Sequence, residues 1–224
     1  MTSPRLVESS TPTDPDAAVL VLHGGASRRE RMMVSPTQLS VLRMIPVARR
    51  IVGAGRGRLA VFRLLNSSRG WDAHHTPVDD VRWALAEVAE RYSADLPVGL
   101  VGHSLGGRAA LLAGDAPPVR SVVALNPWVY PSDAADLTGR RVLIVHGRDD
   151  RIADPRRAMT VARTLSQTAL SLGFVSVEGG KHAMLRRGRV FERAAADFVV
   201  ATVGGQSVDG PVGQVLAGEE HVSV

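Results

Sequence analysis

The stretch Val98-Gly-Leu-Val-Gly-His-Ser104-Leu-Gly-Gly-Arg-Ala-Ala-Leu111 decides the expected fold. It starts as an apolar run, which is typical of a strand buried on both faces of a parallel sheet. It continues as a segment with helix-forming residues, and Ser104 lies at the junction. Glycines stand two positions before and two positions after Ser104, where they permit a tight turn. We therefore expect a strand, a sharp turn and a helix, with Ser104 at the exposed turn.

Similar apolar runs recur along the chain, each followed by a segment long enough for a crossover helix. They cover residues 17–22, 59–65, 98–101, 119–125 and 142–145. Three helix starts are indicated by a capping residue followed by proline, at Ser35-Pro36, Thr76-Pro77 and Asp154-Pro155. We expect these helices to run to about residues 51, 92 and 172, the first kinked at Pro46. A short strand over 174–177 and a helix over 189–203 complete the series.

This alternation predicts an α/β fold with an open, mostly parallel sheet and helices on both faces. The chain has 224 residues, of which 45% are hydrophobic and 22% charged, and this fits one globular domain. We expect the domain to cover residues 17–203. Residues 1–16 are expected to form an N-terminal extension. Residues 204–224 show no periodicity and are expected to form a disordered tail.

Composition and charge exclude several classes of protein. The chain has no cysteine, which excludes disulfides, thiolate metal sites and a cysteine nucleophile. The net charge is +5, but the arginines are scattered without interleaved aromatic residues, so we expect no nucleic-acid partner. The first apolar run is too short for a signal segment or a membrane span. We therefore expect a cytoplasmic protein with no membrane partner.

Ser104 is the candidate nucleophile, because the turn exposes it and a helix amino terminus favours negative charge beside it. A Gly-x-Ser-x-Gly pentapeptide alone is a weak signal in a chain with 22 glycines. Three further motifs follow apolar runs, where functional loops of a parallel sheet gather. They are His23-Gly24-Gly25, His146-Gly147-Arg148-Asp149-Asp150 and Gly179-Gly180-Lys181-His182. The order along the chain is thus serine, acid, histidine.

On these motifs the chain resembles the α/β-hydrolase family, and among its branches the small cap-less dienelactone-hydrolase-like and esterase-like proteins. The resemblance covers about residues 17–203. It implies that Ser104 is the nucleophile, His182 the base and Asp150 the acid, with Asp149 as the alternative acid. A second position that carries the acid in some members of the family is occupied here by Asn126.

The resemblance also implies an oxyanion hole made by backbone amides. The donors would be the amide of Leu105, directly after the nucleophile, and that of Gly25, with Ala26 as the alternative. For the rim of a substrate pocket we expect Trp128, Trp71 and Met32, since each follows the end of a strand.

Two features depart from the family pattern. Dienelactone hydrolases have cysteine at the elbow, whereas this chain has serine, and the N-terminal strands must be shortened. Only 14 residues separate Asn126 from Arg141, too few for an inserted helical lid, so we expect no lid domain and an open site.

The expected function is that of a serine hydrolase of the carboxylesterase type, which cleaves a small-molecule ester through an acyl-enzyme. No metal or organic cofactor is expected. Thioester or lactone substrates, and acyl transfer to an acceptor other than water, would use the same site. The alternative from another class is a non-catalytic binding protein that keeps the α/β-hydrolase fold.

Overall fold

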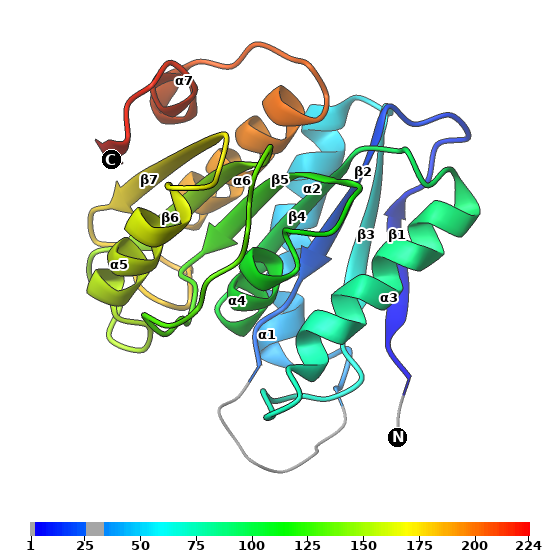
Figure 1. Cartoon of the computed structure of the whole chain (residues 1–224), viewed down its shortest axis with the longest axis horizontal. Helices are drawn as coiled ribbons and strands as arrows, with labels where there is room; N and C mark the ends of the chain where they lie inside the picture. Colours follow the sequence, from blue (N-terminus) through cyan, green and yellow to red (C-terminus); the bar gives the residue numbers. More distant parts are fainter. Residues whose placement is uncertain (1–2, 26–33) are drawn as a thin grey trace.

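The computed structural model describes residues 3–25 and 34–224. Their strands form one eight-stranded sheet in the order β1-β3-β2-β4-β5-β6-β7-β8 (Figure 1). Only β1 runs antiparallel to its neighbour among the paired strands described. The strands are β1 (Arg5–Ser10), β2 (Ala17–Leu22), β3 (Leu59–Leu65), β4 (Val98–His103), β5 (Val119–Leu125), β6 (Arg141–Gly147), β7 (Ser171–Val177) and β8 (His221–Ser223).

Helices cover both faces of this sheet, as the alternation of strands and helices predicts (Figure 1). The helices are α1 (Leu39–Leu42), α2 (Met44–Gly55), α3 (Thr76–Arg91), α4 (Leu105–Leu112), α5 (Pro155–Leu165), α6 (Gly188–Thr202) and α7 (Gly210–Leu216). Helices α3, α4 and α5 pack on one face, and α2, α6 and α7 pack on the other. The predicted α/β class with an open, mostly parallel sheet is confirmed.

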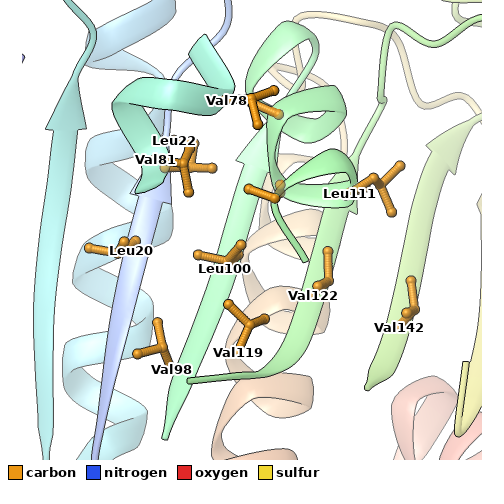
Figure 2. Close-up of a cluster of buried hydrophobic side chains, with 14 of the residues drawn as sticks. Leu20, Leu22, Val78, Val81, Val98, Leu100, Leu111, Val119, Val122 and Val142 are labelled. Carbon is orange, nitrogen blue, oxygen red and sulfur yellow. The ribbon is translucent and has the colours of Figure 1, made fainter. Parts of the chain in front are cut away.

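The continuous apolar runs follow from this two-sided burial. In β2 the residues Ala18, Leu20 and Leu22 belong to the core cluster on the α3 face, where Figure 2 shows Leu20 and Leu22 near Val78 and Val81. The alternate residues of β2, Ala17, Val19 and Val21, belong to the cluster on the opposite face. Since side chains of a strand alternate between faces, a strand covered on both sides needs apolar residues at every position.

The region between β5 and β6 has no lid. Residues 126–140, all of which the structure describes, contain turns and a single isolated bridge from Thr138 to Ala169. In the part of the chain that the structure describes, no helix has the length and hydropathy needed to span a bilayer.

The predicted boundaries of two helices are wrong. The first helix is divided into α1 and α2 at Arg43, and Pro46 causes no kink because it lies in the first turn of α2, where an N–H has no intrahelical acceptor. Helix α5 ends at Leu165, and β7 begins at Ser171 instead of residue 174. Strand β7 is longer than predicted because it pairs with β6 along its whole length.

The predicted N-terminal extension is also wrong for residues 5–10. These residues form β1, which pairs with β3 and adds an antiparallel edge strand to the sheet. In the described chain a single strand, β1, precedes the central strand β2. A mixture of polar and apolar residues is tolerated in β1 because an edge strand is only partly buried.

The predicted disordered tail is wrong as well, since residues 210–216 form α7 and residues 221–223 form β8. Strand β8 pairs with β7, and Val212, Val215 and Val222 are buried against the α6 face of the sheet. A Cβ placed on Gly173 would lie 2.1 Å from Cγ1 of Val215, so α7 packs directly on β7. Elements this short carry no readable periodicity, and tertiary contacts determine them.

This packing predicts that a charge at Val215 destabilises the protein and that a charge next to it does not. Val215→Asp places an unpaired carboxylate in the core and should lower the free energy of unfolding by about 2 kcal/mol or more. Gln214→Asp changes an exposed residue of the same helix and should stay within about 0.5 kcal/mol. Urea unfolding measures both, and equal stabilities of the two variants would show that α7 is not packed.

Candidate active site

The turn between β4 and α4 holds Ser104 in a backbone conformation that non-glycine residues rarely adopt. Ser104 has φ 57° and ψ −120°, which costs on the order of 1–3 kcal/mol. The flanking glycines are required by close approach: a Cβ on Gly102 would lie 2.1 Å from the carbonyl oxygen of Gly106. A Cβ on Gly106 would lie 2.5 Å from the carbonyl oxygen of His23. The turn thus brings Ser104 to the end of the sheet beside the loop after β2.

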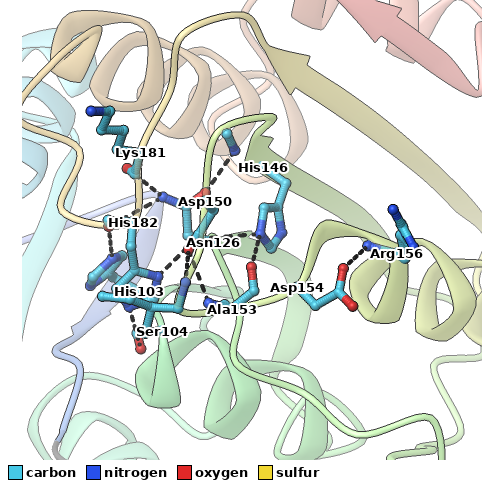
Figure 3. Close-up of polar contacts among 12 residues, drawn as sticks. His103, Ser104, Asn126, His146, Asp150, Ala153, Asp154, Arg156, Lys181 and His182 are labelled. Atoms are coloured by element: carbon cyan, nitrogen blue, oxygen red, sulfur yellow. Dashed lines mark hydrogen bonds and ion pairs between the residues drawn. The ribbon is translucent and has the colours of Figure 1, made fainter.

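The structure brings together Ser104, His182 and Asp150, which come from three different loops (Figure 3). The Oγ of Ser104 lies 3.0 Å from Nε2 of His182, and Nδ1 of His182 lies 2.8 Å from Oδ2 of Asp150. Because a carboxylate accepts hydrogen bonds, Nδ1 carries the proton, and Nε2 is free to accept the proton of Ser104. The three residues form a continuous chain of hydrogen bonds.

Asp150 is buried and fully hydrogen-bonded. Its Oδ1 accepts from the amides of Ile152 and Ala153 at 2.8 and 2.9 Å. Its Oδ2 faces His182 and also Nε2 of His146 at 3.5 Å. Burial by itself raises the pKa of the Asp150 carboxyl. The hydrogen bonds from His146, His182 and the backbone amides lower it by more, so the net pKa is well below its usual range. Asp150 is therefore an anion at neutral pH.

The neighbouring carboxylate, Asp149, points elsewhere. It is exposed, and its backbone amide donates to the carbonyl of Gly180 at 3.0 Å. Of the two acids that the sequence leaves open at this turn, the geometry thus places Asp150 against His182.

Two buried side chains that the sequence does not assign to the site hold the His182 loop. Asn126 donates from Nδ2 to the carbonyls of Lys181 and His182 at 3.2 and 3.3 Å, and its Oδ1 accepts from the amide of Gly147 at 2.8 Å. His103 donates from Nε2 to the same His182 carbonyl at 2.8 Å. Asn126 therefore links the loop that carries His182 to the end of β6, which leads to Asp150. Its position directly after β5 is the only sequence signal for this role.

The loop after β2 lies opposite Ser104. A Cβ on Gly24 would lie 3.2 Å from Cβ of Ser104. A Cβ on Gly25 would lie 2.3 Å from the carbonyl oxygen of Arg69, so only glycine fits there. His23 fixes the base of this loop, since its Nε2 accepts from the amide of Asn66 and its Nδ1 donates to the carbonyl of Gly24. Ala26, the alternative donor, lies outside the described residues.

A cavity of about 300 Å³ opens above Ser104. Of the sequence-predicted site residues, Ser104, His182, Gly25, Leu105 and Trp128 line it. The backbone amide of Trp128 donates to the carbonyl of Ser104 at 3.1 Å, which holds the Trp128 loop against the elbow. Sequence reasoning did not assign five further lining residues to the site, which are Gly24, Ser40, Arg43, His103 and Ile152.

Trp71 and Met32 are not part of this lining as described. The ring of Trp71 covers the guanidinium of Arg108, with 4.1 Å between the guanidinium carbon and the ring centroid. Arg108 in turn makes a buried, two-pronged ion pair with Asp133 at 2.7 Å for each hydrogen bond. Trp71 is therefore a packing residue next to the site, and Met32 lies outside the described residues. In residues 3–25 and 34–224, no three histidine or acidic side chains converge as they would in a metal site.

The chain was compared with protein families, curated proteins and solved structures. No family model and no curated protein matches the sequence. Solved structures do match. A lid-less α/β serine hydrolase from Xanthomonas campestris is 18% identical with a TM-score of 0.64, covering 90% of this chain and 95% of its own. The esterase domain of a Rhodothermus marinus protein is 20% identical with a TM-score of 0.60, covering 91% of this chain and 100% of its own.

A third similar structure is an α/β serine hydrolase homologue from Coxiella burnetii, which is 17% identical with a TM-score of 0.61. It covers 86% of this chain and 89% of its own. At such low identity these likenesses define the fold. The protein has the α/β-hydrolase fold in its small form without a lid.

The burial of His103 predicts how stability depends on pH. Burial, together with the nearby charge of His182, lowers the pKa of His103 to about 3. Between pH 6.5 and 3 the unfolded chain therefore binds a proton at this residue that the folded protein does not. Stability from this group is present above pH 6.5 and is lost as the pH falls. From pH 7 to 5 it should lower the free energy of unfolding by about 2 kcal/mol.

Urea unfolding at both pH values measures this loss. In His103→Gln the loss should be smaller by about that 2 kcal/mol, since the group that titrates is gone. The exposed His74→Gln serves as the matched control and should keep the wild-type dependence on pH. Parallel curves for wild type and His103→Gln would contradict the assignment.

Proposed function

We propose that this protein is a serine hydrolase of the carboxylesterase type, which cleaves a small-molecule ester through an acyl-enzyme. The observation that carries the proposal is the hydrogen-bonded chain from Ser104 through His182 to Asp150, at 3.0 and 2.8 Å. Serine is not nucleophilic at neutral pH, and an oriented imidazole within hydrogen-bond reach is what activates it. The fold shared with esterases and serine hydrolases supports this assignment.

In the proposed reaction, Ser104 Oγ attacks the ester carbonyl carbon while its proton passes to Nε2 of His182. The Asp150 carboxylate holds the imidazole in orientation and stabilises the imidazolium that forms. The backbone amides of Gly25 and Leu105 bind the oxyanion of the tetrahedral intermediate. Collapse of the intermediate breaks the bond to the alcohol, which leaves with the proton from His182.

In the second half of the proposed reaction, water hydrolyses the acyl-enzyme. His182 takes a proton from the water, the hydroxyl oxygen attacks the acyl carbon, and Ser104 leaves with the proton returned by His182. The absence of a lid over residues 126–140 keeps the cavity accessible to water during this half of the reaction. Thioesters would be cleaved at the same site by the same steps.

A non-catalytic binding protein with this fold is the alternative function. It gives no reason for a serine held at φ 57° with a histidine 3.0 Å away, because a binding pocket has no need of a strained nucleophile.

Fluorophosphonate labelling separates the two functions. The reagent reacts only with an activated serine, so the wild-type protein should be labelled at Ser104 and Ser104→Ala should not. His182→Ala should label at least a hundredfold more slowly, because the base is removed. A folded wild-type protein that stays unlabelled would refute the proposal.

The two neighbouring carboxylates provide a matched pair of variants. Asp150→Asn keeps the shape of the side chain but removes the charge that orients and stabilises the imidazolium, and kcat should fall by roughly 10³–10⁴. Asp149→Asn changes an exposed residue of the same turn and should leave kcat within about threefold. The rates are measured on an activated ester such as 4-nitrophenyl hexanoate. Equal losses in both variants would show that Asp150 has no special role.

A further inference from the structure

Arg43 lies at the junction of α1 and α2, where its side chain forms part of the wall of the cavity above Ser104. The same side chain lines an adjoining hollow of about 540 Å³ between α2 and the loop that leads to α6. Arg43 therefore stands between the candidate nucleophile and a second space large enough for part of a ligand.

The guanidinium of Arg43 has no acidic partner among the described residues. Its Nε is buried and has no hydrogen-bond acceptor, and burial lowers the pKa of this group. Arg108, by contrast, forms a buried two-pronged ion pair with Asp133, and the exposed Arg58, Arg91 and Arg148 pair with acidic side chains. Arg69 also has a buried Nε without an acceptor, but it does not line the cavity above Ser104. A partly buried cation without a partner is costly, and a bound anion would remove that cost.

The cavity itself has a positive character. Its described lining contains no aspartate or glutamate, and Arg43 is the one permanently charged residue in that lining. Asp150 does not offset this charge in the cavity, because its carboxylate is buried and faces His146 and His182. Arg43 also contributes to lowering the pKa of His103, which places its positive charge close to the elbow.

We propose that Arg43 binds an anionic group, in the first instance a carboxylate, on the ester substrate. This inference rests on the proposed esterase function and names its substrate class. Guanidinium is suited to the role because its fixed fork of N–H donors matches the two oxygens of a carboxylate. The substrate would be an ester whose acid or alcohol part carries a negative charge a few bonds from the scissile carbonyl.

The adjoining hollow fits a hydrocarbon portion of such a substrate. Pro46, Val47 and Met184 give it apolar walls. Its charged lining residues besides Arg43 are Arg187, Arg189 and Glu192, so positive charge predominates here too. A hydrocarbon chain of the substrate that extends past Arg43 would bury its apolar surface in this hollow, where most of the charged lining residues are basic.

Pairs of esters that differ only in charge test the proposal. On the acid side, 4-nitrophenyl hydrogen adipate is compared with 4-nitrophenyl hexanoate, and the suberate half-ester with the octanoate. On the alcohol side, 4-carboxyphenyl hexanoate is compared with its methyl ester. After subtraction of uncatalysed hydrolysis, wild-type kcat/KM should favour the charged member of at least one pair by roughly tenfold or more.

Variants of Arg43 then assign the preference. Arg43→Gln should abolish the preference, measured as the ratio of kcat/KM between the charged and the uncharged member of each pair, and Arg43→Lys should restore part of it. Arg50→Gln, which changes an exposed arginine of α2 away from the cavity, serves as the control and should keep the wild-type ratio. No preference in the wild type, or the same preference in Arg43→Gln, would overturn the inference.

A second readout separates this inference from the proposed function. Calorimetry measures binding of adipate and of hexanoate to Ser104→Ala and to the double variant Ser104→Ala with Arg43→Gln. If Ser104 labels with fluorophosphonate but adipate binds no better than hexanoate, only the inference about Arg43 fails. If Ser104 stays unlabelled and adipate still binds in an Arg43-dependent manner, the esterase function fails and the anion site stands.

Discussion

The sharp turn at Ser104 is the constraint on which the rest of the site depends. A left-handed backbone at a residue with a side chain is stable only where its surroundings enforce it. Here the enforcing contacts come from buried parallel strands: the Ser104 amide donates to Leu125 at the end of β5, and its carbonyl accepts from Trp128 and Arg108. The flanking glycines let α4 approach β4 and the loop after β2 at distances that no Cβ would permit. The packed core thus stabilises a strained turn that places the Ser104 side chain in the cavity wall.

His182 needs equal restraint, because it lies in a loop between β7 and α6 and has no regular structure of its own. Its carbonyl accepts hydrogen bonds from both Asn126 and His103, which are almost fully buried. Asn126 also accepts from the amide of Gly147, so one side chain links the turn that carries Asp150 to the loop that carries His182. In this arrangement the neutral amide does what a charged acid at that position could not, since a second buried carboxylate would repel Asp150.

Whether a buried ionisable side chain of the site is charged depends on whether it has hydrogen-bond or ion-pair partners. Asp150 keeps its charge because several donors surround it, and the buried Arg108 is paired with Asp133. His103 and His23 lose theirs because burial outweighs their hydrogen bonds, so both support the site as neutral rings. Arg43 is a partly buried cation with no described acidic partner, and it lines the cavity above Ser104.

The sequence by itself determined the alternation of strands and helices, since strands covered on both faces require unbroken apolar runs such as residues 17–22. It also placed the loops of Ser104, Asp150 and His182 at one edge of the sheet, because the carboxyl ends of parallel strands lie at the same edge. Tertiary structure alone decided the rest. It placed Asp150 rather than Asp149 against His182, and it stacked Trp71 on Arg108 outside the described cavity lining. It also formed β1, α7 and β8, and it placed Asn126 against the His182 loop and Arg43 in the cavity wall. These features depend on contacts between segments far apart in the chain, which no local pattern records.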